Sequence, residues 1–401
     1  MKIAQFNAGL SGSPGMLMWV ISEEMDAQNI DNRMLITYGN DAHANVFKYA
    51  SDQEIKVNAL KSRIAGNWGF EARKQTDRAL NYLQEYQPDL IHVHNIHGHD
   101  LVFDTFFAYA KEKKIPVVYT FHDCWAFTGY CTHYVRYACD KYRTQCRNCP
   151  QYRSYSWFLD RSTENYERKK QALLSLPSLT VVTPSRWMAD QVRMSFLKGT
   201  ATVVIPNGID TGIFRPVNSD VRERLGIGNR KMILAIANAI SAEKGREDLL
   251  ELHDRLSSDE VLVLVGITED VKKELPDTII ALPRTNSQSE LAEYYSAADV
   301  LINPTHEDNF PTVNIEALAC GTPVVTYDVG GSPEAIDDMT GTAVPEGDIT
   351  ALYAAVRNLK KTTAVHEVCR KRAVMYYDKH GFAERMINLY RKILSDREET
   401  T

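Results

Sequence analysis

The 401-residue sequence lacks a hydrophobic run long enough to cross a bilayer, and it lacks an excess of positive charge. A transmembrane helix needs about 20 consecutive apolar residues. The uncharged run from Ile3 to Ser22 is interrupted by glycine, serine and proline between Gly9 and Gly15, which also argues against a signal peptide. The formal net charge of -6 argues against a protein that binds nucleic acid through an overall basic surface.

Internal repeats and low-complexity segments are also lacking, so the chain length has to be explained by domains. At roughly 100–200 residues per domain, two domains are expected. Short β-branched runs alternate with helical stretches, a pattern typical of a doubly wound parallel α/β sheet. The predicted strands form two groups: 2–6, 34–38, 89–94, 116–120, 179–183 and 201–205, then 232–237, 261–265, 278–282, 300–303 and 323–327.

The boundary between the two groups is predicted at the turn residues 206–210. We therefore expect a Rossmann-like domain over 1–206 and a second one over 207–380, facing each other across a cleft. A C-terminal helix over 381–401 has one apolar face that must pack against the rest, across the cleft. That face consists of Phe382, Met386, Leu389, Tyr390 and Ile393.

Five of the seven cysteines lie in an insertion at about 124–160. Since the sequence shows no export signal, we expect a cytoplasmic protein, in which clustered cysteines are weighed as metal ligands before disulfides. The C-x2-C spacing at the end of the insertion predicts a structural zinc site, with His133 as a substitute ligand and with disulfides or free thiols as alternatives. The predicted ligands are Cys131, Cys139, Cys146 and Cys149.

The same insertion combines basic and aromatic residues. From Cys131 to Phe158 its net charge is +4, because five basic residues face one acidic residue, Asp140. Such a surface suits the diphosphate head group of a lipid-linked acceptor, or the membrane that carries it. A solvated loop with incidental charges is the alternative.

A glycine-rich segment follows the first predicted strand and precedes a helix expected to begin near Met16. Backbone amides around Gly12, Ser13 and Gly15 are candidates for binding a diphosphate, because the helix dipole favours an anion there. The spacing is not G-x-G-x-x-G, which argues against a dinucleotide-dependent dehydrogenase. An ordinary strand-to-helix turn is the alternative.

An acidic pair follows the strand 300–303. Asp308 is expected in a loop and Glu316 on the following helix, with Pro311 in its first turn and Gly321 just past its end. An anion held at the helix start would meet the backbone of residues 309–312, with Glu316 in reach of a ribose diol. The residues at that helix start are Asn309, Phe310, Pro311 and Thr312.

These motifs together resemble the family 4 glycosyltransferases, the retaining enzymes of the GT-B fold. The similarity covers nearly the whole chain and is most like bacterial enzymes that assemble capsule, exopolysaccharide or lipopolysaccharide O-antigen units. It implies a nucleoside-diphosphate sugar as co-substrate, a glycan or polyprenyl-linked acceptor, no catalytic metal, and a location in the cytoplasm or at the inner membrane face. The segments that carry it are 120–123, 183–185, 205–210, 243–245, 290–299, 316–325 and 330–334.

The resemblance implies a role for each matching acidic residue. Glu316 corresponds to the acid that grips the ribose of the donor nucleotide, and Asp308 to the acid near the transferred sugar. The family usually has glutamate at the position of Asp308. Adjacent Glu307 could compensate for the shorter side chain, and which of the two acts is left open.

The resemblance also implies basic and histidine contacts to the donor. Lys244 corresponds to the phosphate-binding lysine, and the arginine that the family often has five residues earlier is Ala239 here. Arg246 is a candidate substitute, and a solvated lysine at a helix start is the alternative reading of Lys244. His122 corresponds to a histidine that contacts the donor sugar. Further donor-binding candidates are Asn207 and Arg284, the latter near the nucleotide base.

A second group of histidines, at positions 92, 94, 97 and 99, looks like a metal-binding cluster at first sight. Their alternation along a strand favours packing and cleft lining instead. Two other classes of protein remain as alternatives to a transferase: a non-catalytic subunit that binds sugar nucleotides, motivated by Asp308 and Ala239, and a sugar-nucleotide epimerase of the same fold.

Overall fold

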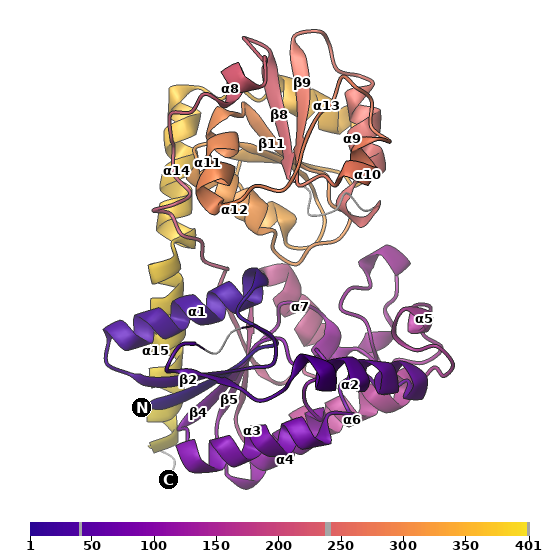
Figure 1. Ribbon diagram of the computed structural model, residues 1–401, viewed down its shortest axis with the longest axis vertical. Coiled ribbons are helices and arrows are strands. Elements are labelled where there is room, and N and C mark those ends of the chain that lie inside the picture. The colour runs from indigo at the N-terminus through magenta and orange to yellow at the C-terminus, as the bar shows by residue number, and fades with distance from the viewer. Residues whose placement is uncertain (40–41, 237–241, 399–401) are drawn as a thin grey trace. The chain divides into compact units, whose positions relative to one another are not determined.

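The computed structural model describes residues 1–39, 42–236 and 242–398, and it divides into two compact units. Unit 1 comprises Met1–Ile205 together with Phe382–Thr401, and unit 2 comprises Pro206–Gly381. Each unit has a parallel sheet with helices on both faces (Figure 1). The predicted fold class, two Rossmann-like doubly wound domains, is therefore confirmed.

The sheet of unit 1 has seven strands in the order β3-β2-β1-β4-β5-β6-β7, all paired in parallel. The order reverses direction between β1 and β4, and in open α/β sheets ligands bind at such a switch point. The strands are β1 (Lys2–Phe6), β2 (Asp31–Ile36), β3 (Val46–Lys48), β4 (Leu90–Val93), β5 (Val117–Thr120), β6 (Leu179–Thr183) and β7 (Ala201–Val204).

The helices of unit 1 cover both faces of this sheet. Successive residues of a strand point to opposite faces; accordingly Ile3 packs with α1 and α15, whereas Ala4 packs in the cluster on the other face. The helices are α1 (Gly12–Ala27), α2 (Asp52–Ala65), α3 (Arg73–Tyr86), α4 (Phe103–Glu112), α5 (Tyr152–Tyr155), α6 (Ser162–Leu174), α7 (Arg186–Met194) and α15 (Lys379–Glu398). Short 3-10 turns lie at η1 (Trp125–Phe127), η2 (Val135–Tyr137) and η3 (Lys141–Arg143).

The C-terminal helix α15 packs on the sheet of unit 1 through its apolar face. Phe382, Met386 and Tyr390 are buried with Ile3 and Val118 of the sheet. The Tyr390 hydroxyl also lies 2.6 Å from Nδ1 of His92 on β4. The last helix thus completes the core of the unit that contains the first strand.

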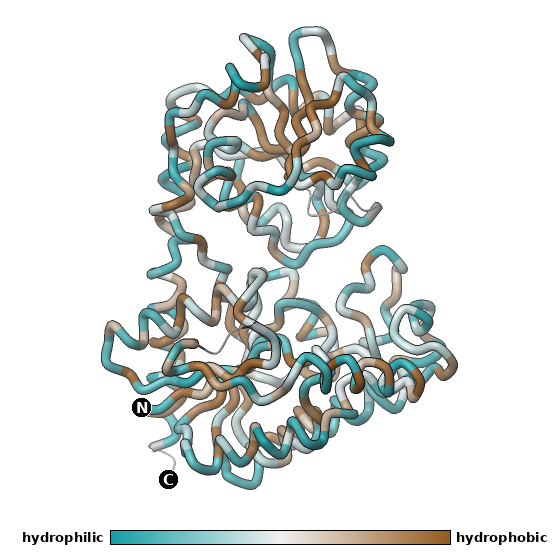
Figure 2. The backbone as a smooth tube through the Cα atoms, in the orientation of Figure 1, coloured by the Kyte–Doolittle hydropathy of each residue, from teal (hydrophilic) through white to brown (hydrophobic). Residues whose placement is uncertain are grey.

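The sheet of unit 2 has six strands in the order β10-β9-β8-β11-β12-β13, again all parallel. Two of its inner strands, β9 and β12, are fully buried, as expected for a sheet covered on both sides, and Figure 2 shows apolar strands at the centre of each unit. The strands are β8 (Lys231–Ile236), β9 (Glu260–Val265), β10 (Ile280–Leu282), β11 (Val300–Asn303), β12 (Val324–Tyr327) and β13 (Gly341–Val344).

The helices of unit 2 follow the same plan. Helices α11, α12 and α14 pack together in one core cluster of the sheet, and α9 packs against α13. The helices of unit 2 are α8 (Val221–Arg224), α9 (Arg246–His253), α10 (Glu269–Lys272), α11 (Gln288–Ala297), α12 (Thr312–Ala319), α13 (Ile349–Asn358) and α14 (Thr363–Tyr377), with 3-10 turns η4 (Ala242–Lys244) and η5 (Ser332–Ala335).

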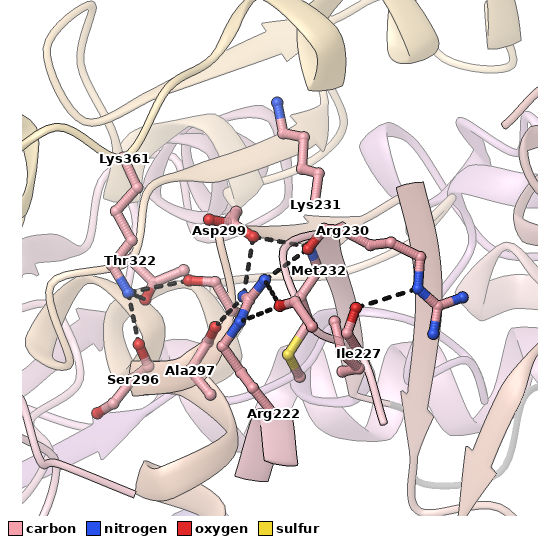
Figure 3. Close-up of polar contacts among 12 residues, drawn as sticks. Arg222, Ile227, Arg230, Lys231, Met232, Ser296, Ala297, Asp299, Thr322 and Lys361 are labelled. Carbon is pink, nitrogen blue, oxygen red and sulfur yellow. Dashed lines mark hydrogen bonds and ion pairs between the residues drawn. The ribbon is translucent and has the colours of Figure 1, made fainter. Parts of the chain in front are cut away.

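A polar network fastens the amino ends of the unit 2 strands (Figure 3). Arg222 of α8 pairs with Asp299 at 3.1 Å, and the same carboxylate accepts the N–H of Met232 at the start of β8. Lys361 donates to the carbonyl of Ser296 at 2.7 Å and to the hydroxyl of Thr322 at 2.8 Å. Because these contacts are internal, this edge of the sheet is structural, and the opposite, carboxyl edge is left for ligands.

Candidate functional site

The carboxyl ends of β8 and β11 bring two loops of unit 2 together. The first leads through η4 to Lys244, and the second runs from Pro304 to Pro311 before α12. The N–H of His306 donates to the Glu243 carbonyl at 2.9 Å, which joins the two loops directly. The predicted basic and acidic residues are therefore neighbours.

Lys244 makes its contacts with the second loop. Its Nζ lies 2.8 Å from Oδ2 of Asp308, and it donates to the Glu307 carbonyl at 3.2 Å and to the Thr305 hydroxyl at 3.5 Å. The lysine side chain is 44% exposed and that of Asp308 is 23% exposed. The pair is thus formed at the surface of the unit, where a ligand can reach the ammonium group.

Asp308 is the acid that meets the lysine. Its Oδ1 accepts the N–H of Phe310 at 3.1 Å, which fixes the carboxylate beside the start of α12. The neighbouring Glu307 has a buried side chain, and its carbonyl accepts a hydrogen bond from Lys244. The shorter side chain of aspartate is therefore long enough to reach the lysine.

Glu316 lies on α12, and its Oε2 accepts a hydrogen bond from the Tyr295 hydroxyl at 2.8 Å. Burial raises the pKa of this carboxyl group, while hydrogen bonds from Tyr295 and Thr312 lower it. Its neighbours Ile315 and Leu318 are buried in the core, which holds the helix against the sheet. Glu316 is therefore an acid of fixed orientation.

Two glycines allow the loops around this pair to approach closely. A Cβ on Gly245 would lie 2.1 Å from the Pro304 carbonyl oxygen, and a Cβ on Gly330 would lie 2.0 Å from the Asp308 carbonyl oxygen. Both residues have positive φ, at 77° and 59°. Only glycine fits both the backbone conformation and the space at these positions.

We expect the substitution Gly330→Ala to lower the free energy of unfolding by about 2 kcal/mol or more, because it combines positive φ with a backbone collision. Gly347 is a matched control, since its φ is +73° but nothing lies within 4 Å of an added Cβ. Gly347→Ala should cost only about 1 kcal/mol. Urea unfolding midpoints measure both changes, and equal losses would show that the approach to Asp308 is unimportant.

A histidine that the sequence analysis did not select braces this loop. His306 binds Asp248 through Nε2 at 2.6 Å and Glu346 through Nδ1 at 2.7 Å, and the Tyr327 hydroxyl donates to Asp248 at 2.8 Å. Burial alone would lower the pKa of His306, but the two acidic partners raise it. The only sequence signal was its position beside Glu307, which does not reveal partners on α9 and after β13.

The other residues predicted to bind a donor in unit 2 have varied surroundings. Arg246 heads α9 and pairs with Glu274 at 2.5 Å, while Arg284 is exposed just after β10. Asn207, Asn309 and Phe310 are buried, and Thr312 is the first residue of α12. Pro311 precedes the helix in an extended conformation and is not in its first turn. Ala239 lies outside the described residues.

The glycine-rich segment of unit 1 differs from the prediction. Helix α1 begins at Gly12, and not near Met16, so Gly12, Ser13 and Gly15 form its first turn. Pro14 is compatible with this start because the first amides of a helix have no intrahelical partner. A Cβ on Gly15 would lie 2.4 Å from the Leu10 carbonyl carbon, so glycine is required for the tight entry into the helix.

His122 follows β5 in unit 1 and lies within a group of histidines. Its Nε2 is 3.0 Å from Nδ1 of His94, and the two rings are stacked. Burial lowers the pKa of His122 to about 4, against the attraction of Asp123. His97 pairs with Asp123 at 2.8 Å, and His92 is buried against Thr120 and Tyr390. These partners favour packing and hydrogen bonding over metal binding by the histidines.

The structure does not support the predicted zinc site. Within residues 1–39, 42–236 and 242–398, no group of three or more His, Cys, Asp or Glu side chains is arranged to hold a metal ion. Cys131 and Cys146 are buried in the core of unit 1, and Cys139 and Cys149 pack against it as free thiols. Burial raises the pKa of Cys146 to about 12, with Cys139 and Cys149 adding to the rise and Lys169 opposing it, so the predicted ligands are near one another as thiols.

Known proteins resemble this chain both in sequence family and in fold. A family model described as Glycosyltransferase Family 4 matches residues 55–212, and one described as Glycosyl transferases group 1 matches residues 217–374. A D-inositol 3-phosphate glycosyltransferase from Geodermatophilus obscurus is 33% identical over 175 residues. That match covers 38% of this chain, and the chain spans only 39% of the relative's length.

Two solved structures match nearly the whole chain. Sucrose-phosphate synthase from Thermosynechococcus elongatus has a TM-score of 0.72 at 20% identity, covering 99% of this chain and 100% of that one. HepE from Anabaena in complex with UDP has a TM-score of 0.68 at 16% identity, with coverages of 98% and 100%. These structures show that the chain has the GT-B fold. The two family models, which match most of the chain between them, show that it is a glycosyltransferase and belongs to family 4, as its motifs predicted.

Proposed function

We propose that this protein transfers a sugar from a nucleoside diphosphate sugar to a glycan or lipid-linked acceptor with retention of configuration. The observation that carries the proposal is the ion pair of Lys244 and Asp308 beside the start of α12, with Glu316 fixed on the same helix. It provides a cation and helix amides for the diphosphate of the donor, and two carboxylates for its ribose and its transferred sugar.

Lys244 and the start of α12 bind the donor diphosphate in this proposal. The exposed ammonium group supplies positive charge, and the helix dipole favours an anion at the same place. Glu316 accepts hydrogen bonds from the ribose diol, while Tyr295 holds its carboxylate in place. HepE from Anabaena, which shares the fold, has also been solved in complex with UDP-glucose, and this supports a nucleotide sugar of the same class as the donor.

The chemistry in the proposal is mainly electrostatic. Negative charge gathers on the diphosphate as the glycosidic bond breaks, so the groups that bind it are worth more in the transition state than in the ground state. The acceptor hydroxyl attacks from the face that the diphosphate leaves, and its proton passes to the departing phosphate oxygen. Asp308 positions the sugar. From family resemblance, His122 and the segment Gly12–Gly15 of unit 1 are assigned to the donor as well.

The acceptor in this proposal is a glycan or a lipid-linked sugar. Exposed Arg143 and Arg147 of the cysteine-containing insertion suit a diphosphate-linked lipid acceptor. Assembly of a bacterial surface polysaccharide fits the sequence resemblance. It is also supported by WaaG, another protein of this fold, which is a glycosyltransferase involved in lipopolysaccharide biosynthesis.

The test is donor hydrolysis across UDP-, GDP-, dTDP- and ADP-sugars, comparing wild type with Glu316→Ala. We expect slow release of one nucleotide by wild type and a loss of about 100-fold or more in the variant. Glu367→Ala on the exposed side of α14 is the matched control and should behave like wild type. A donor that binds but is never turned over, with any acceptor, would instead indicate a non-catalytic sugar-nucleotide-binding subunit.

A further inference from the structure

His306 lies in the middle of the loop that holds Lys244. The Nζ of Lys244 donates to the Thr305 hydroxyl at 3.5 Å and to the Glu307 carbonyl at 3.2 Å, so its contacts lie on both sides of His306. The N–H of His306 donates to the carbonyl of Glu243, the residue before the lysine, at 2.9 Å. A displacement of His306 would therefore move the acceptors of Lys244.

Each nitrogen of the His306 ring faces a carboxylate. Nε2 lies 2.6 Å from Oδ2 of Asp248 on α9, and Nδ1 lies 2.7 Å from Oε1 of Glu346, which follows β13. An ionised carboxylate can only accept hydrogen bonds, so both ring nitrogens have to donate, and only the positively charged ring carries a proton on each. In the neutral ring one nitrogen would point a lone pair at a carboxylate oxygen. The two contacts thus describe a protonated His306.

The ring is held in a fixed orientation between these carboxylates. The second oxygen of Asp248 accepts the Tyr327 hydroxyl at 2.8 Å, and the ring of Tyr327 lies 5.4 Å from that of His306. The side chains of Asp248 and His306 are 12% and 23% exposed, so solvent screens their attraction only in part. Loss of the ring proton would remove the positive charge from between two carboxylates and weaken both contacts.

The surroundings of the ring favour its charged form. Burial alone would lower the pKa of His306, but Glu346 and Asp248 raise it above its ordinary value. The proton is therefore kept to higher pH than on an exposed histidine. The titratable side chains that contact His306 or the residues beside it are Lys244 from η4, Asp248 from α9, Tyr327 from β12, Glu346 after β13, and Glu307 and Asp308 from its own loop. Four of these are acidic and one is basic, so the positive ring sits among an excess of carboxylates.

The loop is fixed separately at its far end. The Asp308 carbonyl accepts the N–H of Gly331 at 3.1 Å, and Oδ1 of Asp308 accepts the N–H of Phe310 at the same distance. The contacts of His306 therefore control the near end of the loop, which is the end that meets Lys244.

We propose that protonated His306 is a positioning residue for the donor diphosphate, an inference that rests on the proposed function. Its charge ties the loop to α9 and to the segment after β13, and the loop in turn holds the Nζ of Lys244 in place to bind phosphate. When the ring loses its proton, its contact with one carboxylate is lost and the loop around Lys244 loosens. His306 acts on the donor through Lys244.

The test compares wild type with His306→Gln, which is neutral at every pH, and with His306→Arg, which stays charged and can pair with two carboxylates. Isothermal titration measures the affinity for UDP, GDP, dTDP and ADP, and single turnovers measure nucleotide release from the corresponding donor sugars. Near pH 6.5, we expect His306→Gln to lower turnover about tenfold and affinity about threefold, because a misplaced Lys244 costs more in the transition state. His306→Arg should keep at least about half of both.

The pH profile distinguishes positioning from packing. Relative to His306→Arg, wild-type turnover should fall as the pH rises from about 6 to about 9 through the raised pKa of His306, whereas His306→Gln should show no such fall. The ratio of two proteins cancels the titrations that they share, such as that of the phosphate. Glu346→Gln removes a carboxylate that raises the pKa of His306, so its fall should occur about one pH unit lower.

His253→Gln is the matched control. His253 is the last residue of α9 and its Nε2 lies 2.8 Å from the Thr278 hydroxyl, so the variant should follow the wild-type profile. Thermal unfolding at each pH establishes that every variant is folded. If His306→Arg does not fold, the shift in the profile of Glu346→Gln decides the question.

The possible outcomes separate this inference from the proposed function. A folded His306→Gln variant with the turnover, affinity and pH profile of wild type would overturn the inference, and so would a profile that does not shift in Glu346→Gln. Wild type that binds a diphosphate but turns over no donor would overturn the proposed function, and the affinities would then decide on His306: a ratio to His306→Arg that falls with pH supports the inference, and a constant ratio contradicts it. Wild type that binds none of the four diphosphates would contradict both.

Discussion

Replacing Lys244 by alanine should lower the turnover of the nucleotide-sugar donor by about 100- to 1,000-fold. The reason is that the Nζ of Lys244 places a positive charge beside the loop before α12, where it contacts Asp308 and the Glu307 carbonyl. Charge that develops on a leaving diphosphate has to be stabilised there, and removing one such group typically costs this much. The measurement is single-turnover release of the nucleotide at saturating donor, so that binding and chemistry are separated.

The matched control for this variant is Lys273→Ala, which removes an exposed lysine of unit 2 that is 74% exposed and pairs with Asp270. It should leave turnover unchanged. If Lys244→Ala kept more than about half of the wild-type rate while Lys273→Ala behaved as expected, the phosphate site would have to lie elsewhere in the chain.

Asp308→Asn should distinguish the role of Asp308 from that of its ion-pair partner Lys244. The carboxylate at 2.8 Å neutralises part of the charge that Lys244 offers to a phosphate. We therefore expect the variant to bind free nucleoside diphosphate several-fold more tightly, because one unfavourable charge is removed from the site. Its turnover should fall. Isothermal titration measures the affinity, and weaker binding of the diphosphate would show that Asp308 does not face it.

The sequence was most informative where apolar runs are long and buried. Strands β1, β6 and β11 have the predicted bounds, because their hydrophobic residues lie in the middle of a sheet covered on both sides. The edge strands β3 and β13 were missed. Each is three or four residues long and partly exposed, so neither produces a continuous apolar run. The start of α1 was misplaced because glycine and proline there read as a loop.

The sequence selects candidate residues for the site, but it does not give the contacts among them. Motif similarity selected Lys244, Asp308 and Glu316. It left open whether Asp308 or Glu307 acts, and it could not show that Asp308 pairs with Lys244 while the side chain of Glu307 is buried. The brace around His306 depends on partners far along the chain. The cysteine spacing predicted a zinc site that the described residues do not form.

A buried lysine of unit 1 should make the stability of the protein depend on pH. Lys169 on α6 is completely buried, and its Nζ donates to the Trp125 carbonyl at 2.6 Å and lies 3.8 Å from the centre of that indole ring. Burial lowers the pKa of Lys169 to about 7, against the attraction of Cys146, Cys131 and Asp123. In the unfolded chain a lysine has a pKa of about 10.4.

The direction of the pH effect follows from these two pKa values. Between about pH 7 and pH 10 the unfolded chain binds a proton at Lys169 that the folded chain does not. The free energy of unfolding should therefore rise with pH in this window, by up to about 1.4 kcal/mol per pH unit from this residue. Below pH 7 both states are protonated, and the cost of the buried charge is present in full.

We expect Lys169→Met to remove this dependence. Relative to wild type, the variant should be most favoured at pH 6, and its relative stability should fall steadily between pH 7 and pH 10. Other titrating groups cancel because they are present in both proteins. Urea unfolding at each pH measures the difference, with Lys170→Met as the control, since Lys170 is partly exposed and pairs with Glu167. A difference independent of pH would show that Lys169 does not titrate in this range.

The same substitution links stability to the predicted donor contact of unit 1. Lys169 holds the carbonyl of Trp125, and the N–H of Trp125 donates to Asp123, the residue after His122. Methionine retains the apolar volume but removes the 2.6 Å hydrogen bond to that carbonyl, which is left with the N–H and hydroxyl of Thr128 at 3.3 and 3.5 Å. If the lysine serves packing alone, Lys169→Met should keep full donor turnover at pH 8. If it also positions the segment 122–125, turnover should fall several-fold in a protein that remains folded.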